Sequence, residues 1–282
     1  MAPTSGIPDS PNKPDSPESP GPTFHTQVVR THQVTPRMLR VTLGGDDLAD
    51  FTPAGPDQFV YVSLPTAGSS LPAGSRAPTE AIRDPFSGAE EVGGRHGGYY
   101  TVRRHRPERA EVDLDMVLYG DGPCSAWAAR AQPGDPVLLS EPQATYAPPA
   151  GTARRLLVTD ETGLPAVGAI LESLGPGDHA HAFVEIEDED EHQRLTTLGD
   201  VEITWLPRFG VPPGTPPLLI EAVREWLVPP GDGYVWGGGE SRAMALVRRH
   251  VRLHWELSSE QVDLNEYWRH SMHADDPVDG DA

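Results

Sequence analysis

Hydrophobic and polar residues alternate in short runs through the first half of the chain. A two-residue period is typical of strands that bury one face, because successive side chains point to opposite sides. The runs predict strands over residues 24–30, 38–43, 58–64, 99–104, 112–119 and 137–141. Turns rich in glycine and proline separate them, which favours a small antiparallel β-barrel. Residues 65–98 keep no period and are predicted to form a long loop.

The pattern changes after residues 147–151, whose alanines, prolines and glycine indicate a linker. Beyond it, short apolar strands alternate with segments of helical period. Strands are predicted over 156–159, 180–186, 201–206 and 233–236, and helices over 164–174, 217–227 and 241–255. Alternating strands and helices form parallel sheets, whose ligands usually bind at the carboxyl ends of the strands.

Two tails are predicted to flank the two domains. Residues 1–22 hold seven prolines and no aromatic residue, a composition that cannot bury enough surface to fold. We therefore predict a disordered tail over 1–22, a barrel domain over 23–146, an α/β domain over 147–274 and an acidic tail over 275–282.

Composition narrows the possible functions. With 42 acidic and 22 basic residues the chain carries a net charge of −20, which opposes binding to nucleic acid. Lys13 is the only lysine and lies in the tail, so Schiff-base and P-loop chemistry has no folded lysine to use. Cys124 is the only cysteine, which excludes intrachain disulfides and clusters held by four cysteines of one chain. The sequence shows neither a signal-peptide pattern nor an apolar run of about 18 residues, so we expect a cytoplasmic protein without a membrane span.

The predicted fourth strand carries candidate ligand-binding side chains. Alternation places Tyr99, Thr101 and Arg103 on one side and Tyr100 and Val102 on the other. An aromatic ring, a hydroxyl and a guanidinium on one strand could stack on a flat heterocycle, bond its edge and neutralise a phosphate. Tyrosine and threonine are also common in strands, so the pattern by itself does not require a ligand.

A turn after the fifth strand offers a second candidate site. Residues 120–125 precede a predicted helix over 126–131, with Ser125 as its N-cap. Backbone N–H groups at such a turn can bind pyrophosphate, although the same residues also suit a capped helix with no ligand. Cys124 has no neighbouring histidine in the sequence and is predicted to be a small buried residue rather than a nucleophile.

Two strand-to-helix turns in the α/β domain are candidate nucleotide sites. Residues 158–166 run from a strand into a helix, with Thr162 as its predicted N-cap. Residues 234–240 repeat the arrangement, with three glycines before Glu240 that would let a ligand lie against the backbone. Parallel sheets bind phosphates at such turns, yet neither has the G-x-G-x-x-G sequence, and a flexible turn is the alternative for the glycines.

Two polar clusters are not expected to bind metal. His179 and His181 have the spacing of metal ligands on a strand, but no third ligand joins them clearly, so surface histidines are the prediction. Residues 185–191 hold six acidic residues and are predicted to form a solvated turn.

Six motifs follow one another along the chain: Tyr100-Thr101-Val102-Arg103, Gly122 to Ala128, Pro133-Gly134-Asp135, Asp160 to Ala166, Trp236 to Glu240, and Tyr267-Trp268-Arg269. Their order resembles the siderophore-interacting protein family, flavin-dependent ferric-siderophore reductases of the ferredoxin-reductase-like superfamily. The resemblance covers about residues 24–271. It implies a two-domain ferredoxin-reductase-like fold, in which the six-stranded antiparallel barrel binds FAD and the α/β parallel-sheet domain resembles an NAD(P)H-binding domain.

The resemblance also implies specific contacts to FAD. Tyr100 would lie against the isoalloxazine ring and Thr101 near its polar edge, while Arg103 and the turn at 122–125 would hold the phosphates. Trp127 would lie alongside. The implied FAD contacts in full are Tyr100, Thr101, Val102, Arg103, Tyr119, Gly122, Pro123, Cys124, Ser125, Trp127, Asp160 and Thr162, the last two closing the pocket from the second domain.

The implied reaction passes electrons from NADH, NADPH or ferredoxin through FAD to ferric iron in a siderophore, and releases Fe²⁺. No protein acid or base and no metal held by the protein is implied. Family members attract anionic siderophores with basic side chains, which implies substrate or donor contacts for Arg242 and Arg269 and a weaker one for Arg130. Glu240 is a further implied substrate or donor contact.

The sequence departs from the family pattern at three positions. Gly98 stands where the family usually has the first arginine of R-x-Y-T-x-R, although Arg95 or Arg104 could compensate. Tyr119 replaces a common histidine, and Ser271 replaces a glycine that often follows Tyr-Trp-Arg.

These departures keep two alternatives open. The chain could bind FAD for a different role in a natural-product biosynthetic pathway, or it could bind siderophores without a flavin. The donor is also open, since either Arg208 or Arg242 could bind the 2′-phosphate of NADPH.

Overall fold

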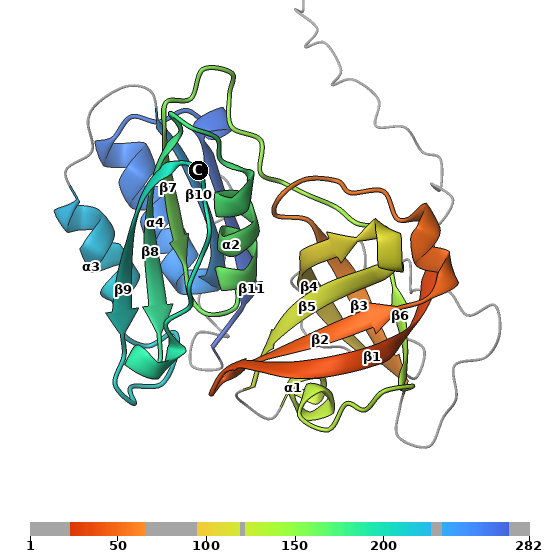
Figure 1. Ribbon diagram of the computed structural model, residues 1–282. Coiled ribbons are helices and arrows are strands. Elements are labelled where there is room, and N and C mark those ends of the chain that lie inside the picture. The colour runs from red at the N-terminus through yellow and green to blue at the C-terminus, as the bar shows by residue number, and fades with distance from the viewer. Residues whose placement is uncertain (1–22, 66–94, 119–121, 227–232, 271–282) are drawn as a thin grey trace, which may run out of the picture.

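Six strands close into a barrel in the computed structural model, which describes residues 23–65, 95–118, 122–226 and 233–270. The strands are β1 (Phe24–Thr35), β2 (Met38–Gly44), β3 (Phe59–Pro65), β4 (Arg95–Arg106), β5 (Glu111–Val117) and β6 (Pro136–Leu139). They pair antiparallel in the closed order β1-β2-β5-β4-β3-β6 (Figure 1), so the predicted barrel is confirmed. β4 begins before the predicted residue 99, and most of the predicted loop, residues 66–94, lies outside the described residues.

Alternation along each strand separates an apolar interior from a charged exterior. On β5, Leu114 and Met116 point into the barrel and are at most 1% exposed. Asp115 points outward, where Arg40 Nε lies 2.6 Å from its Oδ1. A cross-strand arginine lets an outward carboxylate be buried, because the charge keeps a hydrogen-bonded partner. Short helices connect the barrel strands: η1 (Asp46–Asp50), η2 (Pro107–Arg109) and α1 (Pro123–Ala128).

The second domain is a parallel five-stranded sheet with helices on both faces. Its strands are β7 (Arg154–Thr159), β8 (His179–Ile186), β9 (Asp200–Pro207), β10 (Gly233–Glu240) and β11 (Val262–Trp268), in the order β11-β10-β7-β8-β9. Its helices are α2 (Leu164–Ser173), α3 (Leu218–Glu225), α4 (Ser241–His254), η3 (Glu189–Glu191) and η4 (Ser259–Gln261). Figure 1 shows α2 on the side of the sheet nearer the barrel, and α3 and α4 on the other side.

The sheet extends beyond the sequence prediction at its C-terminal end. β10 continues through the three glycines to Glu240, where a turn was expected after residue 236. The glycines pair with β7 and with β11, a strand that was not predicted. A Cβ at Gly237 would lie 2.6 Å from the Leu264 side chain, and a Cβ at Gly238 would lie 2.6 Å from the Tyr267 ring. Close packing therefore requires these glycines, and they belong to a strand rather than to the flexible turn that was the alternative.

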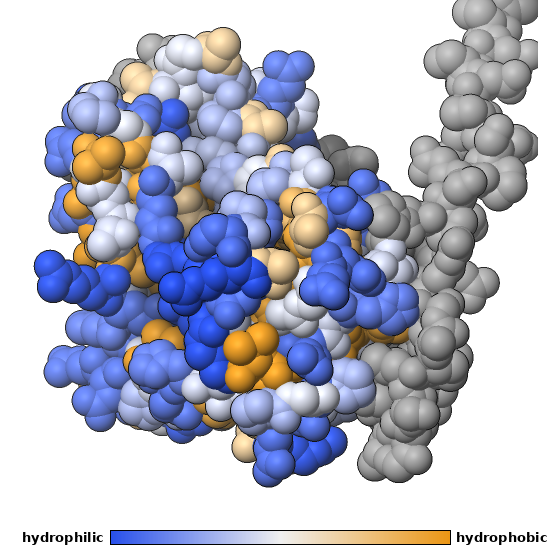
Figure 2. All heavy atoms as spheres, turned by 45° about the vertical axis from the view of Figure 1, so that its right-hand side comes forward, coloured by the Kyte–Doolittle hydropathy of each residue, from blue (hydrophilic) through white to orange (hydrophobic). Residues whose placement is uncertain are grey.

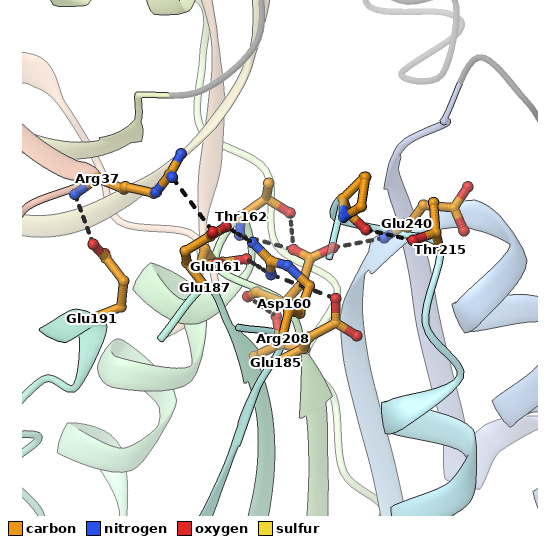
Figure 3. A network of polar contacts seen from close by, with 12 residues as sticks. Arg37, Asp160, Glu161, Thr162, Glu185, Glu187, Glu191, Arg208, Thr215 and Glu240 are labelled. Carbon is orange, nitrogen blue, oxygen red and sulfur yellow. Dashed lines mark hydrogen bonds and ion pairs between the residues drawn. The ribbon is translucent and has the colours of Figure 1, made fainter. Parts of the chain in front are cut away.

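The acidic segment 185–191 packs against the barrel. Glu191 is 3% exposed and accepts hydrogen bonds from Thr35 Oγ1 at 2.5 Å and from the backbone N–H of Arg37 at 2.8 Å. Arg37 Nη2 also lies 3.4 Å from Glu187 Oε1 (Figure 3). The predicted solvated turn is wrong here, because the tip of the β1–β2 hairpin supplies donors for these carboxylates.

One face of the molecule is largely hydrophilic (Figure 2). On the face drawn in Figure 2, apolar side chains form only small, separate patches. A search of the described helices finds none that is both long and apolar enough to cross a membrane.

Candidate functional site

Strand β4 presents opposite faces to the two domains, as its alternation predicts. Val102 lies in the barrel core, and Tyr100 packs against it. Thr101 and Arg103 point the other way, toward the α/β domain. Thr101 hydrogen-bonds to the phenol of Tyr267, and Arg103 pairs with Glu172. The strand is thus the seam at which the domains meet.

Tyr100 and Cys124 contact each other beside Gly98. Burial, and next the neighbouring Cys124, raise the pKa of Tyr100 well above its usual value. Burial also raises the pKa of the Cys124 thiol to about 11, so the thiol stays neutral at physiological pH, as expected of a small buried residue rather than a nucleophile. A Cβ at Gly98 would lie 3.4 Å from Tyr100 Cε2 and 3.7 Å from Cys124 Sγ, which are ordinary contacts. A Cβ therefore fits at position 98.

The side chain of Arg103 packs against helix α2. Its Nη2 and Nη1 lie 2.7 Å and 3.1 Å from the two carboxylate oxygens of Glu172, and the residue is 7% exposed. The guanidinium lies over Gly168, where a Cβ would approach it to 2.9 Å. The resemblance assigns Arg103 to the FAD phosphates. In this structure its bidentate partner is a carboxylate of the second domain, so that assignment stays a prediction.

Helix α1 begins earlier than predicted. Gly122 is its N-cap and Pro123 its first residue, so Ser125 lies inside the helix and the predicted Ser125 cap is wrong. Proline suits a first helical turn because its missing N–H is not needed there. Trp127 is 6% exposed and belongs to the barrel core. Arg130 Nη1 donates to the carbonyl of Ala126 in the same turn of chain, and Tyr119 lies outside the described residues.

Asp160 is the centre of a hydrogen-bond network at the carboxyl end of the sheet (Figure 3). Its Oδ1 accepts from Thr162 N at 2.8 Å and from Thr162 Oγ1 at 2.5 Å. Its Oδ2 accepts from Trp268 Nε1 at 2.8 Å and from Glu240 N at 2.9 Å. Burial raises the pKa of Asp160 despite these donors. Gly163, not Thr162, is the N-cap of α2, because the Thr162 side chain turns back to Asp160.

Glu240 caps helix α4 and also contacts the chain that follows β11, at His270. Its Oε2 accepts from the backbone N–H groups of Arg242 at 2.7 Å and Ala243 at 3.1 Å. Arg269 Nε donates to the hydroxyl of Ser241 at 3.3 Å. Arg242 and Arg269 are both exposed, and their implied contact with a substrate or donor stays a prediction.

Arg208 is not placed to bind a 2′-phosphate. It is 3% exposed, and its Nη1 and Nη2 lie 2.8 Å from Glu161 Oε2 and 3.0 Å from Glu187 Oε2. Glu185 Oε1 follows at 3.5 Å. Burial, and next the charge of Asp160, raise the pKa of Glu185 to about 8. Carboxylates of the same domain therefore hold this arginine in the interior.

Sequence reasoning missed Asp57, a buried carboxylate at the domain junction. Asp57 is 1% exposed, and its Oδ2 accepts from Thr145 N and Oγ1, Tyr146 N and Trp236 Nε1 at 2.9–3.3 Å. These partners lie 88 to 179 positions away in the chain, so no local pattern could reveal them. In the part of the chain that the structure describes, no three His, Cys, Asp or Glu side chains gather to hold a metal ion.

Two family models match the chain on either side of the domain linker. Residues 27–146 match the siderophore-interacting FAD-binding domain, and residues 152–271 match the siderophore-interacting protein model. ViuB, the ferric vibriobactin reductase of Vibrio cholerae, is 27% identical over 86% of this chain and 87% of its own. The NADPH-dependent ferric-chelate reductase of Escherichia coli is 25% identical over 86% of this chain and 91% of its own.

Solved structures agree with these matches. The crystal structure of a siderophore utilization protein from T. fusca is 30% identical, with a TM-score of 0.76 over 90% of this chain and 95% of its own. A ferredoxin NADP+ reductase from Neisseria gonorrhoeae shares the fold at 15% identity, with a TM-score of 0.59 over 86% of this chain and 98% of its own. The chain belongs to the siderophore-interacting protein family and is an FAD-dependent oxidoreductase with a two-domain ferredoxin-reductase-like fold.

Proposed function

We propose that the chain reduces ferric iron held in a siderophore, taking electrons from NAD(P)H or ferredoxin through FAD and releasing Fe²⁺. The observation that supports this proposal is the pair of exposed arginines, Arg242 and Arg269, which both contact one hydrogen-bond network at the carboxyl end of the sheet, Arg242 through its backbone N–H and Arg269 through its side chain. A chain of net charge −20 repels anions, so an anionic chelate needs local cations to approach. The printed names of two relatives, a ferric vibriobactin reductase and a ferric-chelate reductase, support the same reaction.

The residues at the domain seam fit FAD. Tyr100 offers a partly buried ring, Thr101 a hydroxyl on the opposite face of the strand, and Gly98 a position without a side chain next to Tyr100. Helix α1 begins without a side-chain cap, which leaves its first backbone N–H groups suited to a phosphate. When bound, FAD supplies the conversion of a two-electron donor to single-electron transfer. In the proposal, the chain's own residues bind and orient it, with Tyr100 beside the ring and Thr101 at the polar edge.

The two helix N-termini at the carboxyl end of the sheet constrain how a donor binds. Asp160 and Glu240 accept the nearby backbone N–H groups of Thr162, Arg242 and Ala243. A dinucleotide phosphate at either turn would meet a carboxylate. In our proposal a phosphate of NAD(P)H is therefore bound by arginine side chains, of which Arg242 is the candidate, rather than by helix N-termini.

The ferric chelate is the substrate, and the chain need only attract and orient it. Hard anionic oxygen ligands hold Fe²⁺ less tightly than Fe³⁺, so reduction promotes release. No residue has to donate or accept a proton for this step.

An anaerobic reduction assay tests the proposal. The FAD-loaded protein is mixed with NADH, NADPH or reduced ferredoxin and a ferric tris-catecholate, and Fe²⁺ is trapped with a chromogenic chelator. We expect reduction by the wild type, and a higher KM with unchanged FAD content for the Arg242→Ala/Arg269→Ala variant. If the protein binds FAD but reduces no ferric chelate with any donor, the reductase proposal is wrong. The departure at Gly98 then favours the biosynthetic role.

A further inference from the structure

We propose that Asp160 and Glu240 are positioning residues: they fasten the end of β11 to the start of α4, so that Arg269 and Arg242 face an anionic ferric chelate together. The inference rests on the proposed function, because it names how that site is assembled. It adds Trp268 and Ser241 as the links through which the two carboxylates act.

The first link joins β11 to the turn after β7. Trp268 Nε1 donates to Asp160 Oδ2 at 2.8 Å, and Arg269 is the next residue along the chain. Asp160 is 2% exposed, so its carboxylate depends on these donors for the hydrogen bonds that water would otherwise supply. Loss of one donor would leave an oxygen of this buried carboxylate without a hydrogen bond and would lower the stability of the fold. The Trp268 contact therefore contributes to stability at this turn.

The second link joins the chain beyond β11 to helix α4. Glu240 Oε2 caps the helix, while its Oε1 accepts from Ser241 Oγ at 3.3 Å and from His270 N at 3.2 Å. Ser241 Oγ in turn accepts from Arg269 Nε. Arg269 is therefore held through its own side chain, through the indole of the preceding Trp268 and through the backbone N–H of the following His270.

Steric confinement keeps both carboxylates in these roles. A Cβ at Gly239 would lie 2.8 Å from Asp160 Oδ2, and a Cβ at Gly214 would lie 2.7 Å from Glu240 Cγ and 3.0 Å from the Trp268 ring. Only glycine fits at either position without displacing its neighbours. Since the surrounding backbone encloses Asp160 and Glu240, they are suited to hold other residues and not to contact a substrate.

The chemistry of the donors explains why acidic residues can serve a site for anions. The carboxylates accept from an indole N–H, a serine hydroxyl and backbone N–H groups, all of which are neutral. These donors give the two buried carboxylates hydrogen bonds from dipoles, and Arg242 and Arg269 are exposed residues. Preorganised cations bind an anion more tightly because less side-chain entropy is lost on binding.

Two conservative substitutions test the inference in the FAD-loaded protein. Trp268→Phe removes the indole N–H and keeps a ring, and Ser241→Ala removes only the hydroxyl. The probe is the gallium(III) complex of a hexadentate tris-catecholate, a trianion that cannot be reduced and whose binding is measured by calorimetry. We expect each variant to bind it about fivefold to tenfold more weakly, with unchanged FAD content and flavin spectrum.

Matched controls and a double-mutant cycle separate positioning from a general structural effect. Trp255→Phe, at the far end of α4 among Trp226 and His250, and Ser173→Ala, at the end of α2, should bind the probe as the wild type does. In an Arg269→Ala background, Trp268→Phe should cause little further loss, because it acts through Arg269.

The outcomes distinguish the two proposals. Wild-type affinity in both test variants, or an equal loss with and without Arg269, overturns the positioning role. So does a wild type that does not bind the gallium trianion. A wild type that binds it but reduces no ferric chelate with any donor instead contradicts the reductase function and leaves the positioning result standing.

Discussion

Single glycines decide how closely the two domains approach at the seam. The ring of Tyr267 lies over Gly238, where a Cβ would come within 2.6–2.9 Å of three ring carbons. In this position the Tyr267 phenol forms a hydrogen bond with the Thr101 side chain on β4. A register shift between Gly239 and Glu240 leaves Tyr267 as an extra residue of β11, and such bulges redirect side chains next to functional sites.

Gly238→Ala should therefore disturb the seam. The added methyl group would push the Tyr267 ring away and lower the free energy of unfolding by about 1–3 kcal/mol. It should also shift the spectrum or reduction potential of bound FAD, because the Thr101 contact is lost. Gly233→Ala is the control, since a Cβ there has no atom within 4 Å. Equal stability of the two variants would contradict the argument.

A second residue-scale prediction concerns the departure at Gly98. A Cβ there makes only ordinary contacts, so Gly98→Arg should fold and supply the cation that the family pattern has at this position. We expect FAD to dissociate severalfold more slowly from this variant, because a phosphate gains a charged donor. Flavin fluorescence after dilution measures the rate. A rate equal to or faster than that of the wild type would show that another cation already fills the role.

At the scale of elements, the acidic turn over residues 185–191 and the β1–β2 hairpin form a second contact between the domains, in addition to the one between β4 and α2. Glu191 accepts both the Thr35 hydroxyl and the Arg37 N–H, and it is buried. The barrel and the sheet are thus held together by the Glu191 contacts as well as by the Arg103–Glu172 ion pair of β4 and α2.

Glu191→Gln should weaken this docking. The amide keeps the shape of the side chain but removes the charge that strengthens both hydrogen bonds, so we expect a loss of about 1–3 kcal/mol in the free energy of unfolding. Denaturant unfolding measures it. Glu189→Gln, on the exposed side of the same turn, is the control and should change stability little. A cost at position 189 as large as that at 191 would count against a specific contact.

At the scale of the whole molecule, the excess of acidic residues makes stability depend on pH. Burial raises the pKa of Glu185 from the usual 4.5 to about 8, and the pKa values of Asp160, Glu161 and Asp263 are raised in the same direction. A carboxyl with a raised pKa binds its proton more tightly in the folded state. Its contribution to stability is therefore complete below about pH 4.5 and is lost as the pH rises through about 8.

Glu185→Gln should flatten this dependence. In the wild type, Glu185 can lower the free energy of unfolding by up to about 1.4 kcal/mol per pH unit between about pH 5 and 8. The glutamine variant cannot lose a proton, so its stability should fall less over that interval. Thermal unfolding at a series of pH values measures the slopes. Parallel curves for the two proteins would show that Glu185 is ionised throughout the interval.

Local sequence determined the plan of the two domains. Periods of two and of about 3.6 residues depend only on neighbours along the chain, so they predicted the six barrel strands and the alternating strands and helices. Because these patterns depend only on local sequence, they could not predict elements that are defined by packing against distant residues. β11 has no clean alternation, since it packs at the edge of the sheet with most of its residues partly exposed. The glycines of β10 resemble a turn, and only packing against Leu264 and Tyr267 makes them a strand.

The order of motifs, from Tyr100 to Arg269, also sufficed to identify the family, because it can be read without knowing any contact. What each motif residue does was decided by tertiary structure alone. Arg103 meets Glu172 across 69 positions of the chain, and Asp160 meets Trp268 across 108. A buried charge must take whichever partners the fold brings to it, and these partners lie on other elements or in the other domain. The sequence thus determined which side chains stand at the carboxyl end of the sheet, and the fold determined which of them are held there and which remain exposed.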